Sequence, residues 1–169
     1  IVSDRPTGCA VVMVDTEGEN SIVVASGANL DVRAHQVSDA LLQSNRVLVL
    51  QQEVSFEENE SLGCRAQQAG LKIVLNLAPA TRIPEGLLAN TDFLIVNEVE
   101  AKFLAGAQPH VSMTELAEHL ANTYDCGTLI TLGPAGCVVA SGDEDAFGVD
   151  APGVEVVDTT GAGDTFTGY

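Results

Sequence analysis

An acidic, glycine-containing stretch, DTTGAGDTF at residues 158–166, has the residue types needed to bind an anion beside a proton acceptor. Its glycines allow the chain to turn sharply into a helix, so that successive amide groups point toward one spot. Such a nest at the start of a helix binds anions, including the charge that builds up on a phosphoryl group during transfer. The predicted anion hole consists of the amides of Gly161, Ala162, Gly163 and Asp164.

Asp164 lies where this turn would become a helix, and its carboxylate could take part in the chemistry. A carboxylate beside a phosphoryl acceptor can take the proton from an attacking hydroxyl, which makes Asp164 a candidate general base. Asp is also a common helix N-cap, and the residues alone support the two interpretations equally. The stretch is not a P-loop, because no Lys follows the glycines.

Short apolar runs predict the elements that must position this stretch. Four nearly continuous runs are typical of parallel strands buried on both faces, and helical stretches separate them: residues 47–50, 72–76, 93–96 and 129–132. Further strands are expected at residues 137–140 and 154–157, joined by an irregular or hairpin connection over residues 142–153. The β-branched runs at residues 9–14 and 21–25 predict a β-hairpin, so the expected fold is one α/β domain with a hairpin appendage.

Capping boxes indicate where helices begin. Ser55 with Glu58 predicts the start of a helix that runs to about residue 69, and Ser112 with Glu115 predicts another helix start. Pro84 is expected in the first turn of a short helix, where its missing N–H costs nothing.

Polar side chains follow four of the predicted strands. Because ligands of open α/β sheets bind beyond the carboxyl ends of the strands, these side chains could form one site. They are Gln52 with Glu53, Asn76, Asn97 with Glu100, and Thr131 with Gly133. Each has a simpler explanation, since Glu53 could be a solvated helix-start residue and Asn97 with Glu100 also has the form of a capping box.

The chain has a formal net charge of −17, which arises mainly because basic residues are scarce. This charge disfavours long-range attraction to nucleic acid or to an anionic membrane surface. The four cysteines form no Cys-x-x-Cys pair and predict buried thiols in a reducing compartment. No apolar run is long enough to span a bilayer.

Several stretches make the chain resemble the ribokinase-like, or PfkB-type, carbohydrate kinases. Residues 158–166 are similar to the C-terminal signature of that family, and NEVE at 97–100 is similar to its Asn-x-x-Glu element. TLGPAG at 131–136 is similar to a strand-end element that lines the nucleotide site. NLAPA at 76–80 is similar to an Asn-Pro-Ala-Pro-Ala stretch, with Leu77 as the departure.

This resemblance implies a three-layer α/β/α sandwich with a mostly parallel central sheet and a small β-hairpin lid. Residues 1–28 would form the lid hairpin and its return, and residues 29–169 an α/β nucleotide-binding and catalytic domain that is incomplete at both ends. The implied reaction is ATP-dependent transfer of the γ-phosphate to a primary sugar hydroxyl, with D-ribose giving D-ribose 5-phosphate favoured by residues 76–80. Alternatives are a fructose, ketodeoxygluconate or nucleoside kinase and, less favoured, a non-catalytic sugar- or nucleotide-binding relative.

The resemblance also implies roles for individual residues. Asp164 would be the general base at the sugar hydroxyl, and Glu53 would hydrogen-bond the sugar. The ATP site would include Asn97, Thr131, Gly133 and Gly136.

Two metal ions are implied. Asn97 and Glu100 would organise Mg²⁺, partly through water, while Asp158 and Thr160 would contact K⁺ as a monovalent activator. We further expect a cytoplasmic enzyme that binds sugar and ATP, pairs into a homodimer through the lid, and has no nucleic-acid or membrane partner. The family's main sugar-recognition elements, an Asn-x-Asp and a Gly-Gly pair, are not in this chain.

Overall fold

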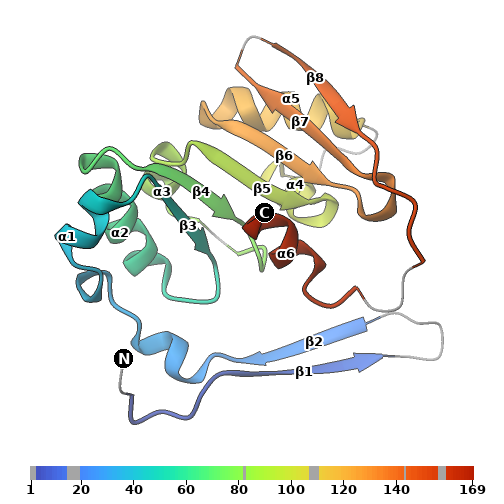
Figure 1. Ribbon diagram of the computed structural model, residues 1–169. Helices are drawn as coiled ribbons and strands as arrows, with labels where there is room; N and C mark the ends of the chain where they lie inside the picture. Colours follow the sequence, from blue (N-terminus) through green and yellow to red (C-terminus); the bar gives the residue numbers. More distant parts are fainter. Residues whose placement is uncertain (1–2, 15–19, 82, 107–110, 143, 156–158) are drawn as a thin grey trace.

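The computed structural model describes residues 3–14, 20–81, 83–106, 111–142, 144–155 and 159–169. Within these residues it has one six-stranded sheet and one separate two-stranded sheet (Figure 1). The two-stranded sheet is an antiparallel hairpin of β1 (Cys9–Val14) and β2 (Asn20–Ala25). The larger sheet has the spatial order β3 (Val47–Gln51), β4 (Lys72–Asn76), β5 (Phe93–Asn97), β6 (Gly127–Thr131), β7 (Cys137–Ser141) and β8 (Glu144–Val149).

The larger sheet is mostly parallel, as predicted. Strands β3 to β6 pair in parallel, whereas β7 and β8 add to the edge in antiparallel pairs. Strand β6 begins two residues before the predicted apolar run, because Gly127 pairs with Phe93 of β5. Within the predicted connection, residues 144–149 form strand β8 and make a hairpin with β7. The strand predicted at residues 154–157 is not observed at Val154 and Glu155, and the rest of it lies outside the described residues.

Helices connect most of the strands. They are α1 (Asp39–Ser44), α2 (Phe56–Gln68), α3 (Glu85–Ala89), α4 (Glu98–Leu104), α5 (Met113–Tyr124) and α6 (Ala162–Gly168), with short 3-10 turns η1 (Gly27–Asp31), η2 (Ala34–Gln36) and η3 (Gly133–Ala135). The capping box predicted at the start of α5 is confirmed, because Ser112 Oγ accepts from Glu115 N and Glu115 accepts from Ser112 N. Pro84 is the N-cap of α3 rather than its first residue.

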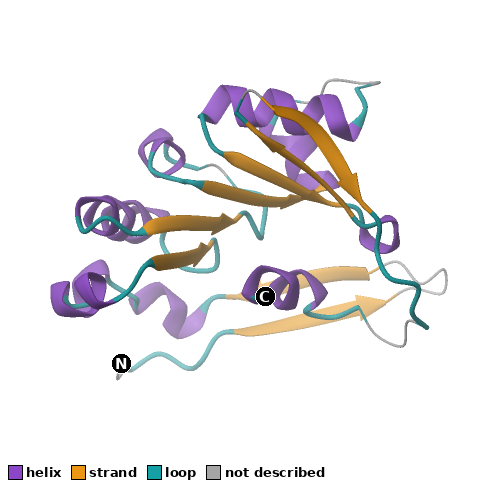
Figure 2. Cartoon of the chain, turned by 45° about the horizontal axis from the view of Figure 1, so that its top comes forward, coloured by secondary structure: helices purple, strands orange, loops and turns teal. Residues whose placement is uncertain are grey.

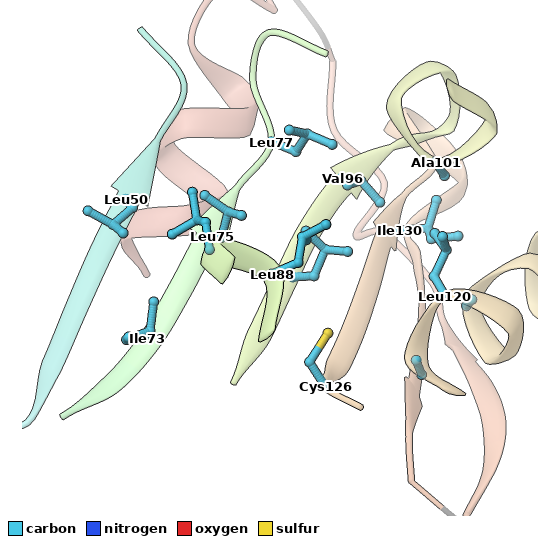
Figure 3. Packing of buried hydrophobic residues seen from close by; sticks show 14 of the residues in the cluster. Leu50, Ile73, Leu75, Leu77, Leu88, Val96, Ala101, Leu120, Cys126 and Ile130 are labelled. Carbon is cyan, nitrogen blue, oxygen red and sulfur yellow. The ribbon is translucent and has the colours of Figure 1, made fainter. Parts of the chain in front are cut away.

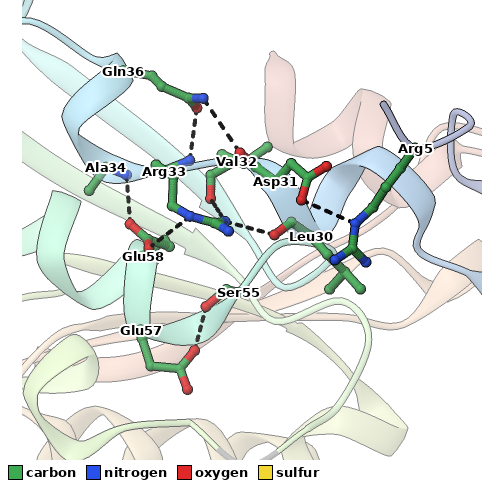
Figure 4. Close-up of polar contacts among 10 residues, drawn as sticks. All are labelled: Arg5, Leu30, Asp31, Val32, Arg33, Ala34, Gln36, Ser55, Glu57 and Glu58. Carbon is green, nitrogen blue, oxygen red and sulfur yellow. Dashed lines mark hydrogen bonds and ion pairs between the residues drawn. The ribbon is translucent and has the colours of Figure 1, made fainter. Parts of the chain in front are cut away.

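The capping box predicted at Ser55 is wrong. Ser55 Oγ donates to Glu57 instead of accepting from the helix backbone. Glu58 instead contacts the chain that follows the hairpin. It accepts a 2.8 Å hydrogen bond from Ala34 N and forms an ion pair with Arg33 at 3.7 Å (Figure 4). A long-range contact therefore replaces the local one.

One hydrophobic core lies between the large sheet and helices α1 to α5. Its fully buried side chains alternate along the strands, as expected for one face of a sheet (Figure 3). On the strands these include Ile73, Leu75, Leu94 and Ile130, and the helices add Leu87 of α3 and Leu120 of α5.

The opposite face of the sheet is more open. Val49 and Phe93 are 52% and 50% exposed, so the prediction that these strands are covered on both faces is wrong for their outward side chains. Figures 1 and 2 show α6 on this other side, between the sheet and the hairpin. Helices therefore flank both faces, but α1 to α5 cover only one.

Ion pairs fix the chain that leads to and from the hairpin (Figure 4). Arg5 Nε lies 3.2 Å from Asp31 Oδ1, which joins the chain before β1 to the chain after β2. Arg65 of α2 donates to the carbonyl oxygens of Ala34 and Val37 at 2.6 and 2.7 Å. The return from the hairpin is thus held against α2.

In the described residues, no helix is long and apolar enough to cross a membrane.

Candidate functional site

The carboxyl ends of the parallel strands meet at one edge of the sheet. Gln51 of β3 lies beside Asn76 of β4, and Asn97 of β5 lies beside Thr131 of β6. The predicted rim of polar groups is therefore confirmed for the strand ends. Asn76 is buried, whereas Asn97 is exposed.

Asn97 and Glu100 form a reciprocal capping box at the start of α4. Asn97 Oδ1 accepts from Glu100 N at 2.8 Å, and Glu100 Oε2 accepts from Asn97 N at 2.7 Å. Glu100 is only 7% exposed, and this burial raises the pKa of its carboxyl, although the hydrogen bond from Asn97 N opposes the rise. The capping interpretation of this pair is confirmed, and it leaves a buried carboxylate at the end of β5.

The turn between β6 and β7 is closely packed. Leu132 N donates to Gly136 O at 2.8 Å, and Gly136 adopts φ 95°, which favours glycine. A Cβ atom at Gly136 would lie only 1.9 Å from the carbonyl oxygen of Val149. Gly136 is therefore required by the close approach of the chain after β8, independently of any ligand.

Beside this turn lies a cavity of about 380 Å³, which we call the turn cavity. Its walls include the predicted residues Thr131, Gly133 and Gly136. Helix α6 closes it with Ala162, Gly163 and Phe166, and the remaining walls are Cys137, Val149, Asp150, Ala151 and Pro152. The turn predicted to bind an anion and the strand-end turn thus border the same space.

Helix α6 begins immediately after Gly161. Gly161 is the N-cap with φ 71°, and Thr165 N donates to Gly161 O at 2.9 Å. Asp164 is in the first turn of the helix, with its side chain exposed, so the alternative that it is the N-cap is wrong. Thr160 is also exposed, and Asp158 lies outside the described residues.

A larger cavity of about 760 Å³ lies between the hairpin and the end of β3, and we call it the hairpin cavity. Glu53 and Asp164 both line it, as does Glu57. Strand β2 contributes Ile22 and Val24, and the other walls are Ser26, Leu30, Gln52, Val54, Ser55, Phe56, Ala78, Pro79 and Thr81. None of these lining residues is basic, so the cavity suits an uncharged, hydroxyl-rich molecule better than an anion.

Helix α6 separates these two cavities by a single turn. Asp164 lines the hairpin cavity, whereas Ala162 and Gly163 line the turn cavity. The candidate general base thus lines one cavity, and two residues of the predicted anion hole line the other. This arrangement could bring a hydroxyl group in one cavity to a phosphoryl group in the other.

Some predicted residues line neither cavity, and some residues that line a cavity were not predicted. Asn76, Asn97 and Glu100 are not among the residues that line either cavity. Sequence reasoning gave no role to Phe166, although it stands inside a stretch that was singled out, and it singled out Gln52 together with Glu53 without giving Gln52 a role of its own. It also missed the chain after β8, because residues 150–152 have no pattern that indicates a ligand.

The described residues fit a magnesium ion only at a site to which the protein contributes few ligands. In the described parts of the chain, no group of three or more His, Cys, Asp or Glu side chains could hold a metal ion by itself. Mg²⁺ commonly binds through one or two carboxylates, several waters and the phosphates of its substrate. One buried carboxylate, Glu100, beside Asn97 fits this sparse protein contribution.

Comparison with known proteins identifies related chains. A ribokinase of Staphylococcus aureus is 35% identical over 171 residues, which are 98% of this chain and 56% of that protein. A ribokinase of Arabidopsis thaliana is 34% identical over 174 residues, covering 98% of this chain and 46% of the relative. The chain therefore spans about half the length of the curated relatives it matches.

Solved structures give the same result. The structure of ribokinase from Giardia lamblia has a TM-score of 0.86 and 30% identity, covering 99% of this chain and 55% of that one. Arabidopsis thaliana ribokinase complexed with ribose and ATP has a TM-score of 0.83 and 31% identity, covering 97% of this chain and 55% of that one. Residues 1–168 also match the family described as pfkB family carbohydrate kinase. With this match over nearly its whole length, and with the fold and cavities above, the chain belongs to the PfkB family of carbohydrate kinases.

Proposed function

We propose that this chain is part of an ATP-dependent sugar kinase that transfers the γ-phosphate to a primary sugar hydroxyl. The observation that carries this proposal is the position of α6 between two cavities. Asp164 lines the hairpin cavity together with Glu53, while Ala162 and Gly163 line the turn cavity. Sugar would occupy the hairpin cavity, and the nucleotide would approach from the turn cavity.

In the proposed reaction, the primary hydroxyl of the sugar points at Asp164. Its oxygen attacks the γ-phosphorus of ATP, the carboxylate of Asp164 accepts the hydroxyl proton, and the bond to the β-phosphate oxygen breaks to release ADP. The amides of residues 161–164 stabilise the charge on the phosphoryl group in flight. Glu53 accepts hydrogen bonds from other hydroxyls and fixes the orientation of the sugar.

Two ions would assist. Bound Mg²⁺ would neutralise charge on the ATP phosphates, and Asn97 and Glu100 would orient it partly through water. We propose that K⁺ contacts Asp158 and Thr160 and supports the anion-binding turn.

D-Ribose is the proposed acceptor, giving D-ribose 5-phosphate. The related chains are named ribokinases, and one related structure is a complex with ribose and ATP. The acidic walls of the hairpin cavity also favour an uncharged acceptor over a phosphorylated one. Fructose, ketodeoxygluconate and nucleosides are the alternative acceptors within the same family.

We propose that residues 1–28 act as a lid over the sugar and residues 29–169 as the nucleotide-binding and catalytic part. Outward side chains of the hairpin favour a homodimer formed through this lid. Val11 and Val23 face each other across the hairpin and are 58% and 59% exposed, on the face opposite to Ile22 and Val24. Sedimentation of the full-length protein tests this dimer.

We propose a cytoplasmic location for the protein. Its four cysteines are free thiols, which are usual in a reducing compartment.

The decisive experiment is an ADP-release assay of the full-length protein over a panel of sugars and nucleosides, with and without K⁺. We expect ribose to give the highest kcat/KM and K⁺ to increase it. ADP release that no acceptor raises above the background would refute the proposed kinase and favour a non-catalytic binding protein.

A further inference from the structure

Gln52 is a buried amide with an unused hydrogen-bond donor. The residue is only 8% exposed, and its Nε2 atom has no hydrogen-bond partner in the described parts of the chain. Buried side-chain donors are nearly always paired in folded proteins, and an unpaired one costs stability. This exception therefore calls for an explanation.

The backbone around Gln52 is firmly held. Its own N–H donates to Ala78 O at 3.0 Å, and the preceding carbonyl, Gln51 O, accepts from Asn59 Nδ2 at 2.7 Å. Asn59 is itself buried on helix α2. The unpaired amide therefore sits on a fixed part of the chain, at the end of strand β3.

Gln52 also lines the hairpin cavity, beside Glu53 and together with Asp164. The ionised carboxylates of this cavity can only accept hydrogen bonds. The cavity is lined by no Lys, Arg or His, and the hydroxyl of Ser55 already donates to Glu57. Besides Gln52, the side-chain donors left among the lining residues are the hydroxyls of Ser26 and Thr81, and Gln52 carries a buried donor that is unused.

We propose that Nε2 of Gln52 donates a hydrogen bond to an oxygen of the bound polyol, next to the hydroxyl from which Glu53 accepts a hydrogen bond. A donor and an acceptor on adjacent residues match two neighbouring oxygens of a sugar, one accepting and one donating. Gln52 is then a specificity-determining residue, because an analogue without that oxygen leaves the buried amide unpaired. This inference rests on the proposed function, since it requires a polyol in the hairpin cavity.

The test uses full-length protein and the change Gln52→Leu, which keeps the approximate size of the side chain and removes the amide. D-Ribose binding is measured calorimetrically without ATP, so that the result does not depend on phosphoryl transfer. We expect ribose to bind about 3- to 10-fold more weakly, the loss of one hydrogen bond. The KM for ATP should be unchanged, and the melting temperature without ribose should be equal or higher, because an unpaired donor has been removed.

Deoxyribose isomers identify the oxygen involved. One isomer, lacking the oxygen that Gln52 contacts, should bind equally to the wild-type protein and to Gln52→Leu, as a double-mutant cycle requires. Gln68→Leu makes the same chemical change on the exposed surface of α2 and should alter none of these values.

Two results would overturn the inference. Unchanged ribose affinity with a lower melting temperature would give Gln52 a purely structural role, while the proposed kinase would stand. If the wild-type protein binds no polyol and releases no ADP, both this inference and the proposed function fail.

Discussion

Glu53 and Asp164 line the same cavity, although Glu53 follows strand β3 and Asp164 lies on the last helix of the chain. Their different surroundings suit different tasks. Asp164 is on the same helical turn as Ala162 and Gly163, which border the second cavity, whereas Glu53 lines the hairpin cavity and is not among the lining residues of the second. Substitution of each carboxylate should therefore affect a different kinetic constant.

Asp164→Asn should remove the proton acceptor and keep the size of the side chain. We expect kcat to fall by about 10²- to 10⁴-fold, the usual contribution of a general base, while ATP and sugar still bind. Steady-state kinetics and calorimetry of the full-length protein measure both effects. Asp145→Asn, an exposed change on β8, is the matched control, and near-normal turnover of Asp164→Asn would remove Asp164 from the mechanism.

Glu53→Gln should mainly weaken sugar binding. Because hydrogen bonds to a charged acceptor are stronger than neutral ones, we expect the KM for the sugar to rise roughly 10- to 100-fold with little change in the KM for ATP. Glu57→Gln is an informative comparison, since Glu57 lines the same cavity but already accepts from Ser55. A larger effect of Glu57→Gln would reassign the sugar contact to that residue.

Glu100→Gln should weaken the response to Mg²⁺. The amide oxygen can still accept from Asn97 N, so the start of α4 should be preserved while the buried charge is lost. We expect half-maximal activity to require roughly 10-fold more Mg²⁺, as for other residues that orient metal-bound groups. Titration of activity with Mg²⁺ tests this against Glu98→Gln on the same helical turn, and equal curves for both variants would argue against a role for Glu100.

Gly136→Ala should destabilise the protein even without ligands. The new methyl group would clash with Val149 O, and φ 95° is unfavourable for Ala, so we expect a loss of about 2–5 kcal/mol in the free energy of unfolding. Gly133→Ala is the control, because a Cβ there meets nothing within 4 Å and only the strain of φ 55° remains, about 1–2 kcal/mol. Chemical denaturation compares the two, and equal losses would contradict the close packing at Gly136.

Asp92 should make stability depend on acid pH. Burial, the largest influence, raises the pKa of this carboxyl, but hydrogen bonds from Lys72 Nζ and Ile73 N together bring it below the ordinary value of 3.8. Stability from the ionised group is therefore complete above the unfolded pKa and is lost as pH falls through the lower folded pKa.

Asp92→Asn should accordingly cost about 1 kcal/mol at neutral pH, a modest value because Lys72 is mostly exposed. The difference in the free energy of unfolding between Asp92→Asn and the wild-type protein should be smaller at about pH 3 than at neutral pH. Urea unfolding at both pH values measures it, and a difference that does not change with pH would show that Asp92 is not the titrating group.

Local patterns in the sequence predicted much of the fold. Strand β4 was predicted to the residue, because its apolar run coincides with the strand, and the capping box at Ser112 formed as expected. Predictions failed where a distant contact decides the outcome. Glu58 binds Ala34 and Arg33 instead of capping α2, and Gly127 joins β6 because it pairs with Phe93.

In the candidate site, too, features set by local sequence could be predicted, whereas features set by distant contacts could not. The stretch from Gly161 to Asp164 could be found from sequence because its glycines, its helix start and its carboxylate lie together along the chain. Gln52 could be singled out only as one of several polar residues at strand ends, since the folded structure alone reveals that its amide is buried without a partner beside Glu53. The contribution of Ile22 to the hairpin cavity likewise depends on where the hairpin lies against the sheet.

The single turn of α6 between the two cavities has a consequence for inhibitor design. If the hairpin cavity takes the sugar and the turn cavity the nucleotide, as proposed, a compound that joins a polyol to an adenine nucleotide could fill both cavities by passing the turn of α6 that carries Gly163 and Asp164. Binding of one half would then hold the other at an effective concentration in roughly the millimolar range. Such a bivalent ligand should be more selective than an inhibitor that resembles the nucleotide alone, because its polyol half would also contact the acidic lining of the hairpin cavity.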